Sequence, residues 1–285
     1  QGSALGGKGI YANNSTFVSE INVENDTFSN ISTNAIQSYN GLQITVKDCY
    51  ATGLLTSFTD LNPLTSGVNV RTKCTIKNNV ADCSASFNPS HSVFSLLGDD
   101  VECTGNKVTG GGVQIVVHDL SGNTLHLRNY VVSDNMLWNS LGNAISINQN
   151  SATYGNNSNA QIVVSNNNIY SPALSGIGVT GAYVGSGATL GSTVISGNTV
   201  VDGLTNTLAP DASAGIVLLG TVNTVVDSNV IISPRYAGIL AYYDGSNISI
   251  NNNIITDHQG RSTVGGGTSL PQAGAPIFIS GGGAT

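Results

Sequence analysis

The sequence predicts an all-β protein folded as a right-handed parallel β-helix, a solenoid of about nine stacked coils. Two observations lead to this fold: a repeat marked by asparagine runs through the 285 residues, and short runs of alternating apolar residues flank each mark. A third observation agrees with them. The chain is 40% hydrophobic but only 9% charged, as expected if aliphatic side chains fill the interior and neutral polar ones cover the surface.

Each repeat has an apolar residue, a marker three positions later and another apolar residue two positions beyond it, as in Val132-Ser-Asp-Asn135-Met-Leu137. Asparagine is the marker in most repeats. The spacing of 23 to 32 residues indicates one structural unit per marker. The markers are Asp26, Cys49, Asn79, Asn106, Asn135, Asn167, Asn198, Asn229 and Asn253.

A second motif of a small residue followed by alternating apolar positions comes after each marker, as in Ser175-Gly176-Ile177-Gly-Val179, and we also expect such a strand at 66–70. The period of two predicts strands, and the units leave too few residues for helices. Stacked coils would pair the same strand face about 4.8 Å apart, and an inward asparagine could bond the asparagines above and below it. A β-sandwich would instead need hairpin Asn-Gly turns, which are scarce here.

We expect residues 1–285 to form a single β-helix domain, with residues 1–9 a cloning scar or cap remnant and the whole a fragment of a longer chain. The net charge of −7 argues against nucleic-acid binding. Without an 18-residue apolar run or a signal peptide, membrane insertion is not expected. The cysteines, whose spacing fits no zinc motif, are expected to be small buried hydrophobes, with a disulfide as the alternative; they are Cys49, Cys74, Cys83 and Cys103.

Charge gathers in the first half of the chain, where seven of the nine Lys and Arg residues lie at or before position 128. When Val68, Val93 and Val113 are taken as equivalent positions, three neighbouring coils place charged groups at one corner. Lys47 and Lys77 fall in register on the outward row of the next strand. The predicted corner cluster consists of Arg71, Lys73, Asp99, Asp100, Glu102, His118 and Asp119.

Two reactions suit this cluster if the substrate is a polysaccharide, the substrate class implied by the family resemblance given below. Hydrolysis needs two carboxyl groups at a defined separation, which Asp99 or Asp100 could form with Asp119 or Glu102. Elimination from a uronate needs a base, such as His118 or a lysine, and a cation such as Arg71 to neutralise the sugar carboxylate. The residues do not decide between them, and Asp-Asp after Gly98 also suits a tight turn. Neither a metal nor another cofactor is predicted.

Two further surface features are expected in the second half of the chain. Arg235, Tyr242, Tyr243 and Asp244 could bind sugar rings, with packing at a subunit interface as the alternative. An outward apolar row, Val217, Leu240 and Phe278, would need burial against another copy or a missing segment. A homotrimer, the assembly implied by the tailspike resemblance given below, would bury it. Long connections, expected to form walls beside the helix, are predicted at 53–66, 118–130, 148–161, 180–193, 202–213 and 257–274.

The marker and strand pattern resembles the pectate-lyase-like superfamily of right-handed parallel β-helices over nearly the whole chain. The low charge and the surface rich in Asn, Ser, Thr and Gly look most like a bacteriophage tailspike or capsule depolymerase. That resemblance implies a trimeric virion protein that binds and cleaves a bacterial surface polysaccharide. The alternatives are a secreted bacterial polysaccharide lyase, hydrolase or epimerase, and a non-catalytic adhesin or carbohydrate-binding fibre. The paired aspartates, the Gly-His-Gly of polygalacturonases and the calcium-binding acidic run of pectate lyases find no match here.

Overall fold

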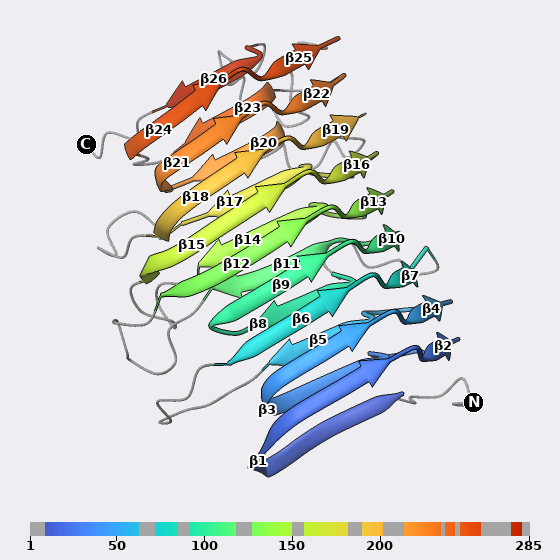
Figure 1. Cartoon of the computed structure of the whole chain (residues 1–285). Coiled ribbons are helices and arrows are strands. Elements are labelled where there is room, and N and C mark those ends of the chain that lie inside the picture. The colour runs from blue at the N-terminus through green and yellow to red at the C-terminus, as the bar shows by residue number, and fades with distance from the viewer. Residues whose placement is uncertain are drawn as a thin grey trace, which may run out of the picture.

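Parallel strands stack into an elongated solenoid in the computed structural model, from β1 at the blue end to β26 at the red end (Figure 1). The structure describes residues 9–62, 72–84, 92–117, 127–149, 157–181, 190–201, 214–234, 237–242, 246–257 and 275–280. No helix occurs among these residues, and therefore none that could cross a membrane. The all-β, right-handed β-helix prediction is confirmed.

Each coil contributes one strand to each of three parallel ladders, which we name A, B and C. Two long strands, β1 (Ile10–Glu24) and β3 (Ile36–Lys47), run through both A and B. The other strands of ladder A are β5 (Thr59–Asn62), β8 (Phe94–Leu97), β11 (Val113–Val117), β14 (Ile145–Gln149), β17 (Ile177–Thr180), β20 (Ala214–Leu219), β23 (Ala237–Tyr242) and β26 (Ile277–Ser280). Those of ladder B are β6 (Lys73–Lys77), β9 (Asp100–Thr104), β12 (Arg128–Ser133), β15 (Asn157–Ser165), β18 (Leu190–Ser196), β21 (Val222–Asp227) and β24 (Ser246–Asn251).

Ladder C is built from short strands that form a separate column at one side of the solenoid (Figure 1). Its nine strands match the expected number of coils. They are β2 (Thr27–Ser29), β4 (Tyr50–Thr52), β7 (Val80–Asp82), β10 (Lys107–Thr109), β13 (Met136–Trp138), β16 (Asn168–Tyr170), β19 (Thr199–Val201), β22 (Val230–Ile232) and β25 (Ile254–Thr256).

Alternate residues of each strand point into one continuous aliphatic core. Three phenylalanines add a tilted stack inside the first coils, with ring centroids 5.7 Å apart between Phe28 and Phe58 and 6.0 Å apart between Phe58 and Phe94. All four cysteines are buried and free, so the prediction of small buried hydrophobes is confirmed. Burial raises the pKa of the Cys74 and Cys83 thiols to about 12.

The predicted asparagine ladder occupies the bend between ladders B and C. In the middle of it, Asn167 Nδ2 donates to Val132 O and to Asn198 Oδ1, both at 2.9 Å. Its Oδ1 accepts from the backbone N–H and the side chain of Asn135, at 3.1 and 2.9 Å. The same pattern runs from Asn79 to Asn253. At the marker before Asn79, the Cys49 thiol donates instead to Val23 O.

A left-handed backbone conformation precedes every marker, with φ between 52° and 67°. Asn, Asp and Gly adopt this conformation at least cost, and they occupy every such position except Ser228. The bend is therefore encoded twice, by the residue that turns the chain and by the asparagine that satisfies the buried backbone groups next to it. These residues are Asn25, Asp48, Asn78, Gly105, Asp134, Asn166, Gly197, Ser228 and Asn252.

Two expectations for ladder A are wrong. The third coil uses β5 rather than a strand at 66–70, because Phe58 and Leu61 supply the inward side chains there and both are fully buried. The connection at 53–66 is consequently short, and segment 63–71 lies outside the described residues. In addition, Val113 pairs with Phe94 rather than with Val93, a shift of one residue.

We predict that Asn167→Ala destabilises the solenoid by about 3 kcal/mol or more, because several buried polar groups lose their partner and each costs about 1–3 kcal/mol. The matched control is Asn168→Ala, whose side chain lies on the outward face of β16; surface changes of this kind stay within about 0.5 kcal/mol. Guanidinium unfolding of both variants measures the difference. Equal unfolding midpoints for the two variants would contradict the role of the ladder.

Candidate functional site

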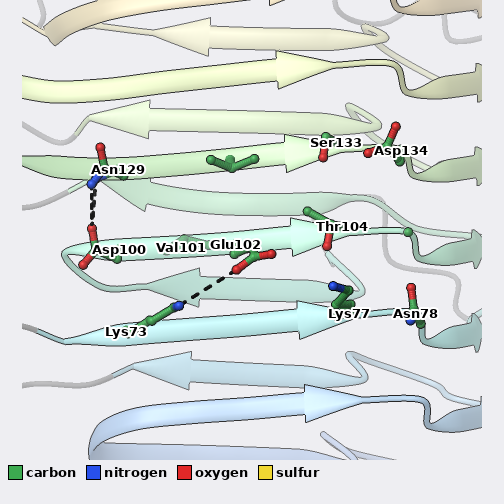
Figure 2. Close-up of a pocket in the computed structure, with 12 residues that line it drawn as sticks. Lys73, Lys77, Asn78, Asp100, Val101, Glu102, Thr104, Asn129, Ser133 and Asp134 are labelled. Atoms are coloured by element: carbon green, nitrogen blue, oxygen red, sulfur yellow. Dashed lines mark hydrogen bonds and ion pairs between the residues drawn. The ribbon is translucent and has the colours of Figure 1, made fainter.

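A shallow hollow of 680 Å³ lies on the outward face of ladder B, over β6, β9 and β12 (Figure 2). Its floor is one flat strand surface, so its chemistry is set by the outward side chains of three neighbouring coils. Both signs of charge are present among amides and hydroxyls. It is lined by Lys73, Lys77, Asn78, Asp100, Val101, Glu102, Thr104, Gly105, Asn129, Val131, Ser133 and Asp134.

Parallel register arranges the outward side chains into three columns. The first contains Lys73, Asp100 and Asn129, one from each coil. The second contains Thr75, Glu102 and Val131, and the third contains Lys77, Thr104 and Ser133. Since neighbouring strands lie about 4.8 Å apart, each column brings its side chains within hydrogen-bonding reach of the next coil.

Two contacts cross the coils inside the hollow, and both are drawn in Figure 2. Lys73 Nζ lies 3.9 Å from Glu102 Oε2, and the two side chains are 52% and 38% exposed. Asp100 Oδ1 accepts from the backbone N–H and from the side-chain amide of Asn129, both at 3.2 Å. An exposed ion pair of this kind adds at most about 1 kcal/mol, so these groups remain available to a ligand.

The two carboxyl residues of β9 are the feature with the most chemical potential. Asp100 and Glu102 are two positions apart on one strand and face the same side, which separates their backbones by about 6.6 Å. Inverting glycosidases hold their two carboxyl groups about 6.5–9.5 Å apart, and side chains that start about 6.6 Å apart on one face can reach such a separation. The hollow thus combines a carboxyl pair, two lysines and several neutral hydrogen-bonding groups.

Asp99, predicted to be catalytic, points the other way. Its side chain is buried, and Oδ2 accepts from Thr72 N at 2.9 Å and from Thr72 Oγ1 at 3.1 Å. Oδ1 lies 3.3 Å from Nε of Arg128, which is fully buried. A carboxylate enclosed in this way cannot reach a substrate, so we assign Asp99 a structural role. Asp99 directly precedes β9 and is in phase with its inward residues Val101 and Cys103, so it lies on the inner side of ladder B.

The remaining predicted residues are only partly covered by the structure. Lys73, Asp100 and Glu102 do come together, as the predicted corner required. Tyr242 ends β23, but its side chain is not described. Six residues lie outside the described part of the chain, so their meeting at the corner or at a second binding surface stays a prediction; they are Arg71, His118, Asp119, Arg235, Tyr243 and Asp244.

The predicted apolar row of ladder A is not an exposed strip. Val217 and Leu240 are only 3% and 8% exposed within the single chain, where they form a small second core with Ala214 and Ala237. Phe278 is partly buried against the same cluster. Burial within one chain removes the need for a second copy at this face, so the row gives no support to a trimer.

Nine of the twelve lining residues were missing from the predicted site: Lys77, Asn78, Val101, Thr104, Gly105, Asn129, Val131, Ser133 and Asp134. The predicted register of Lys47 with Lys77 is confirmed, although Lys77 was not included in the cluster. Counting back two, four and six positions from Asn135 would have placed Ser133, Val131 and Asn129 on the outward row. The signal was therefore present, but charge alone directed attention to other residues.

Comparison with known proteins supports the fold and adds nothing on the site. A family model described as a right-handed beta helix region matches residues 126–280, more than half of the chain. No curated protein and no solved structure gives a match.

We predict that Asp99→Ala destabilises the protein by about 3–5 kcal/mol, because it leaves Arg128 buried without its carboxylate. The neighbouring Asp100→Ala should cost less than about 1 kcal/mol, since its carboxyl group is partly solvated. Replacing both members of the buried pair, as Asp99→Leu with Arg128→Met, should recover part of the loss. Chemical unfolding tests this, and an Asp99→Ala variant as stable as Asp100→Ala would show that the buried pair is unimportant.

Proposed function

The chain belongs to the right-handed β-helix family, and from this premise we propose that it binds a polysaccharide and cleaves it in the hollow over β6, β9 and β12. The carboxyl pair of Asp100 and Glu102 carries this proposal. It lies on an open strand face, two positions apart, beside cationic and neutral groups suited to a sugar chain.

Hydrolysis is the reaction that this arrangement favours. One carboxyl group protonates the oxygen of the leaving sugar while the other activates a water molecule on the opposite face of the ring. We expect inversion at the anomeric carbon, which requires the two carboxyl groups to lie about 6.5–9.5 Å apart around the bound sugar and water. Asn129, Thr104 and Ser133 are placed to bond sugar hydroxyls around the pair.

The two lysines favour an acidic polysaccharide. Lys73 and Lys77 are both exposed at the end of the hollow contributed by β6. An ammonium group there can bind a uronate carboxylate, and it could also stabilise the charge that develops during β-elimination. Elimination is therefore the second candidate reaction. It leaves an unsaturated uronate that absorbs near 232 nm, whereas hydrolysis does not.

We predict that Asp100→Asn and Glu102→Gln each lower the rate of polysaccharide cleavage by about 100-fold or more, the usual contribution of a general acid or base. Asp82→Asn, an equal charge change on ladder C, should leave the rate unchanged. The assay is release of oligosaccharides from a panel of capsular and O-antigen polysaccharides.

The other outcomes of this cleavage assay would each change one part of the proposal. Normal cleavage by both variants would place the reaction elsewhere on the chain. Binding of several polysaccharides without cleavage would overturn the enzyme proposal in favour of a non-catalytic carbohydrate-binding fibre or adhesin. Product absorbance near 232 nm would replace hydrolysis by elimination.

We further propose a tailspike-type homotrimer, which would place the chain on a virion or otherwise outside a cell. A row of outward valines on ladder B beyond the hollow supports this assembly: Val163, Val194 and Val225 lie in register on successive coils. Val194 and Val225 are 36% and 37% exposed. A continuous apolar row on an open strand face is suited to burial against another copy.

We predict that Val194→Asp converts the trimer to a monomer, because a charge in a buried apolar interface is left unpaired. The control is Ser192→Asp, on the neighbouring outward column. This variant should remain a trimer. Light scattering at several protein concentrations measures the mass. A stable monomer in the unmodified protein would exclude the trimer.

A further inference from the structure

A second polar cluster lies on ladder A, away from the hollow and in the first coils of the solenoid, on β1, β3 and β5 (Figure 1). Register places Tyr11, Gln37 and Asp60 in one outward column over three successive coils. Tyr39 lies two positions along β3 from Gln37 and faces the same side. The residue spacing did not predict this cluster, because the strand of this coil was expected at 66–70 and not at β5.

Three neutral donors converge on one oxygen of the Asp60 carboxylate. Oδ2 accepts from Gln37 Nε2 at 2.8 Å, from Tyr39 Oη at 3.1 Å and from Asn34 Nδ2 at 3.2 Å. Gln37 Nε2 also donates to Tyr39 Oη. Burial and the Asp60 charge raise the pKa of the Tyr39 phenol, which keeps it protonated as a donor. The carboxylate is therefore held in a fixed orientation.

One acceptor of the cluster has no hydrogen-bond partner among the described residues, and a second takes no part in the three bonds just described. Asp60 Oδ1 accepts none of the three hydrogen bonds that Oδ2 accepts. Gln37 Oε1 is buried and has no hydrogen-bond partner, and the residue as a whole is only 6% exposed. A buried carbonyl oxygen left in this state costs about 1–3 kcal/mol, a cost that a bound donor would remove.

An aromatic ring adjoins these acceptors. Tyr11 is 49% exposed and lies next to Gln37 in the outward column, one coil away. Exposed tyrosine rings offer an apolar face with a polar end, which suits the C–H face of a sugar ring. Beyond Asp60 the outward column continues with Ser95 and Gln114, which are uncharged, in contrast to the hollow with its lysines and acids.

We propose that Tyr11, Gln37 and Asp60 form a binding site for a neutral sugar ring, separate from the charged hollow. Two adjacent sugar hydroxyls donate to Asp60 Oδ1 and Gln37 Oε1, and the ring stacks on Tyr11. Because Gln37 Oε1 is covered in the unliganded chain, ligand entry requires the side chain of Gln37 or Tyr11 to move. The site does not depend on cleavage in the hollow, since it needs only binding.

The test is saturation-transfer NMR on the full chain with methyl glycosides of glucose, galactose, mannose and rhamnose, and with tetramethylammonium as a cationic probe. We expect at least one glycoside to bind. Its deoxy analogue lacking one of the two hydroxyls, and the Asp60→Asn variant, should each bind about tenfold or more weakly, the effect of losing a hydrogen bond to a charged group.

Two variants keep the result interpretable. Tyr11→Ala changes a half-exposed side chain, so it should weaken sugar binding without altering the unfolding midpoint, even if Asp60→Asn proves unstable. Asp257→Asn, an equal charge change at the other end of the solenoid, should bind like the unmodified chain. Failure of every glycoside to bind, unchanged binding in both Tyr11→Ala and Asp60→Asn, or binding of tetramethylammonium alone would overturn the proposal. Glu102→Gln should retain this binding, which separates it from any failure of the proposed cleavage.

Discussion

The hydrogen bonds of the buried asparagine ladder are the constraint on which every coil depends. At the bend between ladders B and C the backbone turns inside the core, where its N–H and C=O groups cannot reach water. Each asparagine satisfies the coil before it and the coil after it with a single amide, as Asn167 does for Asn135, Val132 and Asn198. An unpaired group there would cost about 1–3 kcal/mol, so a coil without this amide needs a substitute such as the Cys49 thiol.

The asparagine ladder constrains the backbone of each coil but not its outward side chains. The outward faces of ladders A and B therefore differ from coil to coil. Ladder B begins with charged residues such as Lys73 and Glu102 and continues with valines such as Val194. Ladder A carries tyrosine, amide and carboxyl groups at its start and a covered apolar cluster around Val217 near its end. A uniform interior therefore supports several local surfaces, and binding can differ between coils without any change in how they stack.

Strand register was predicted correctly close to an asparagine marker and incorrectly farther from one. Ladder B strands end only two residues before a marker, so the register of Lys47 with Lys77 followed from counting. Ladder A strands are separated from the markers by connections of variable length. There the count slipped by one, pairing Val93 with Val113 in place of Phe94, and a slip of one exchanges the inward and outward faces. Asp99 was included in the cluster because of its charge, although it is in phase with the inward residues Val101 and Cys103. The Asp60 cluster was missed because the strand of this coil was expected at 66–70 rather than at β5.

Asp99 does not line the hollow, but it belongs to the layer of buried side chains directly behind it. Thr72, Asp99 and Arg128 are buried and joined by hydrogen bonds across three coils. Each immediately precedes one member of the first outward column, Lys73, Asp100 and Asn129. Since successive residues of a strand face opposite sides, the inner group holds the starts of β6, β9 and β12 together at the point where the outer group lines the hollow. Asp99 therefore contributes as a positioning residue, by fixing the backbone that carries Asp100.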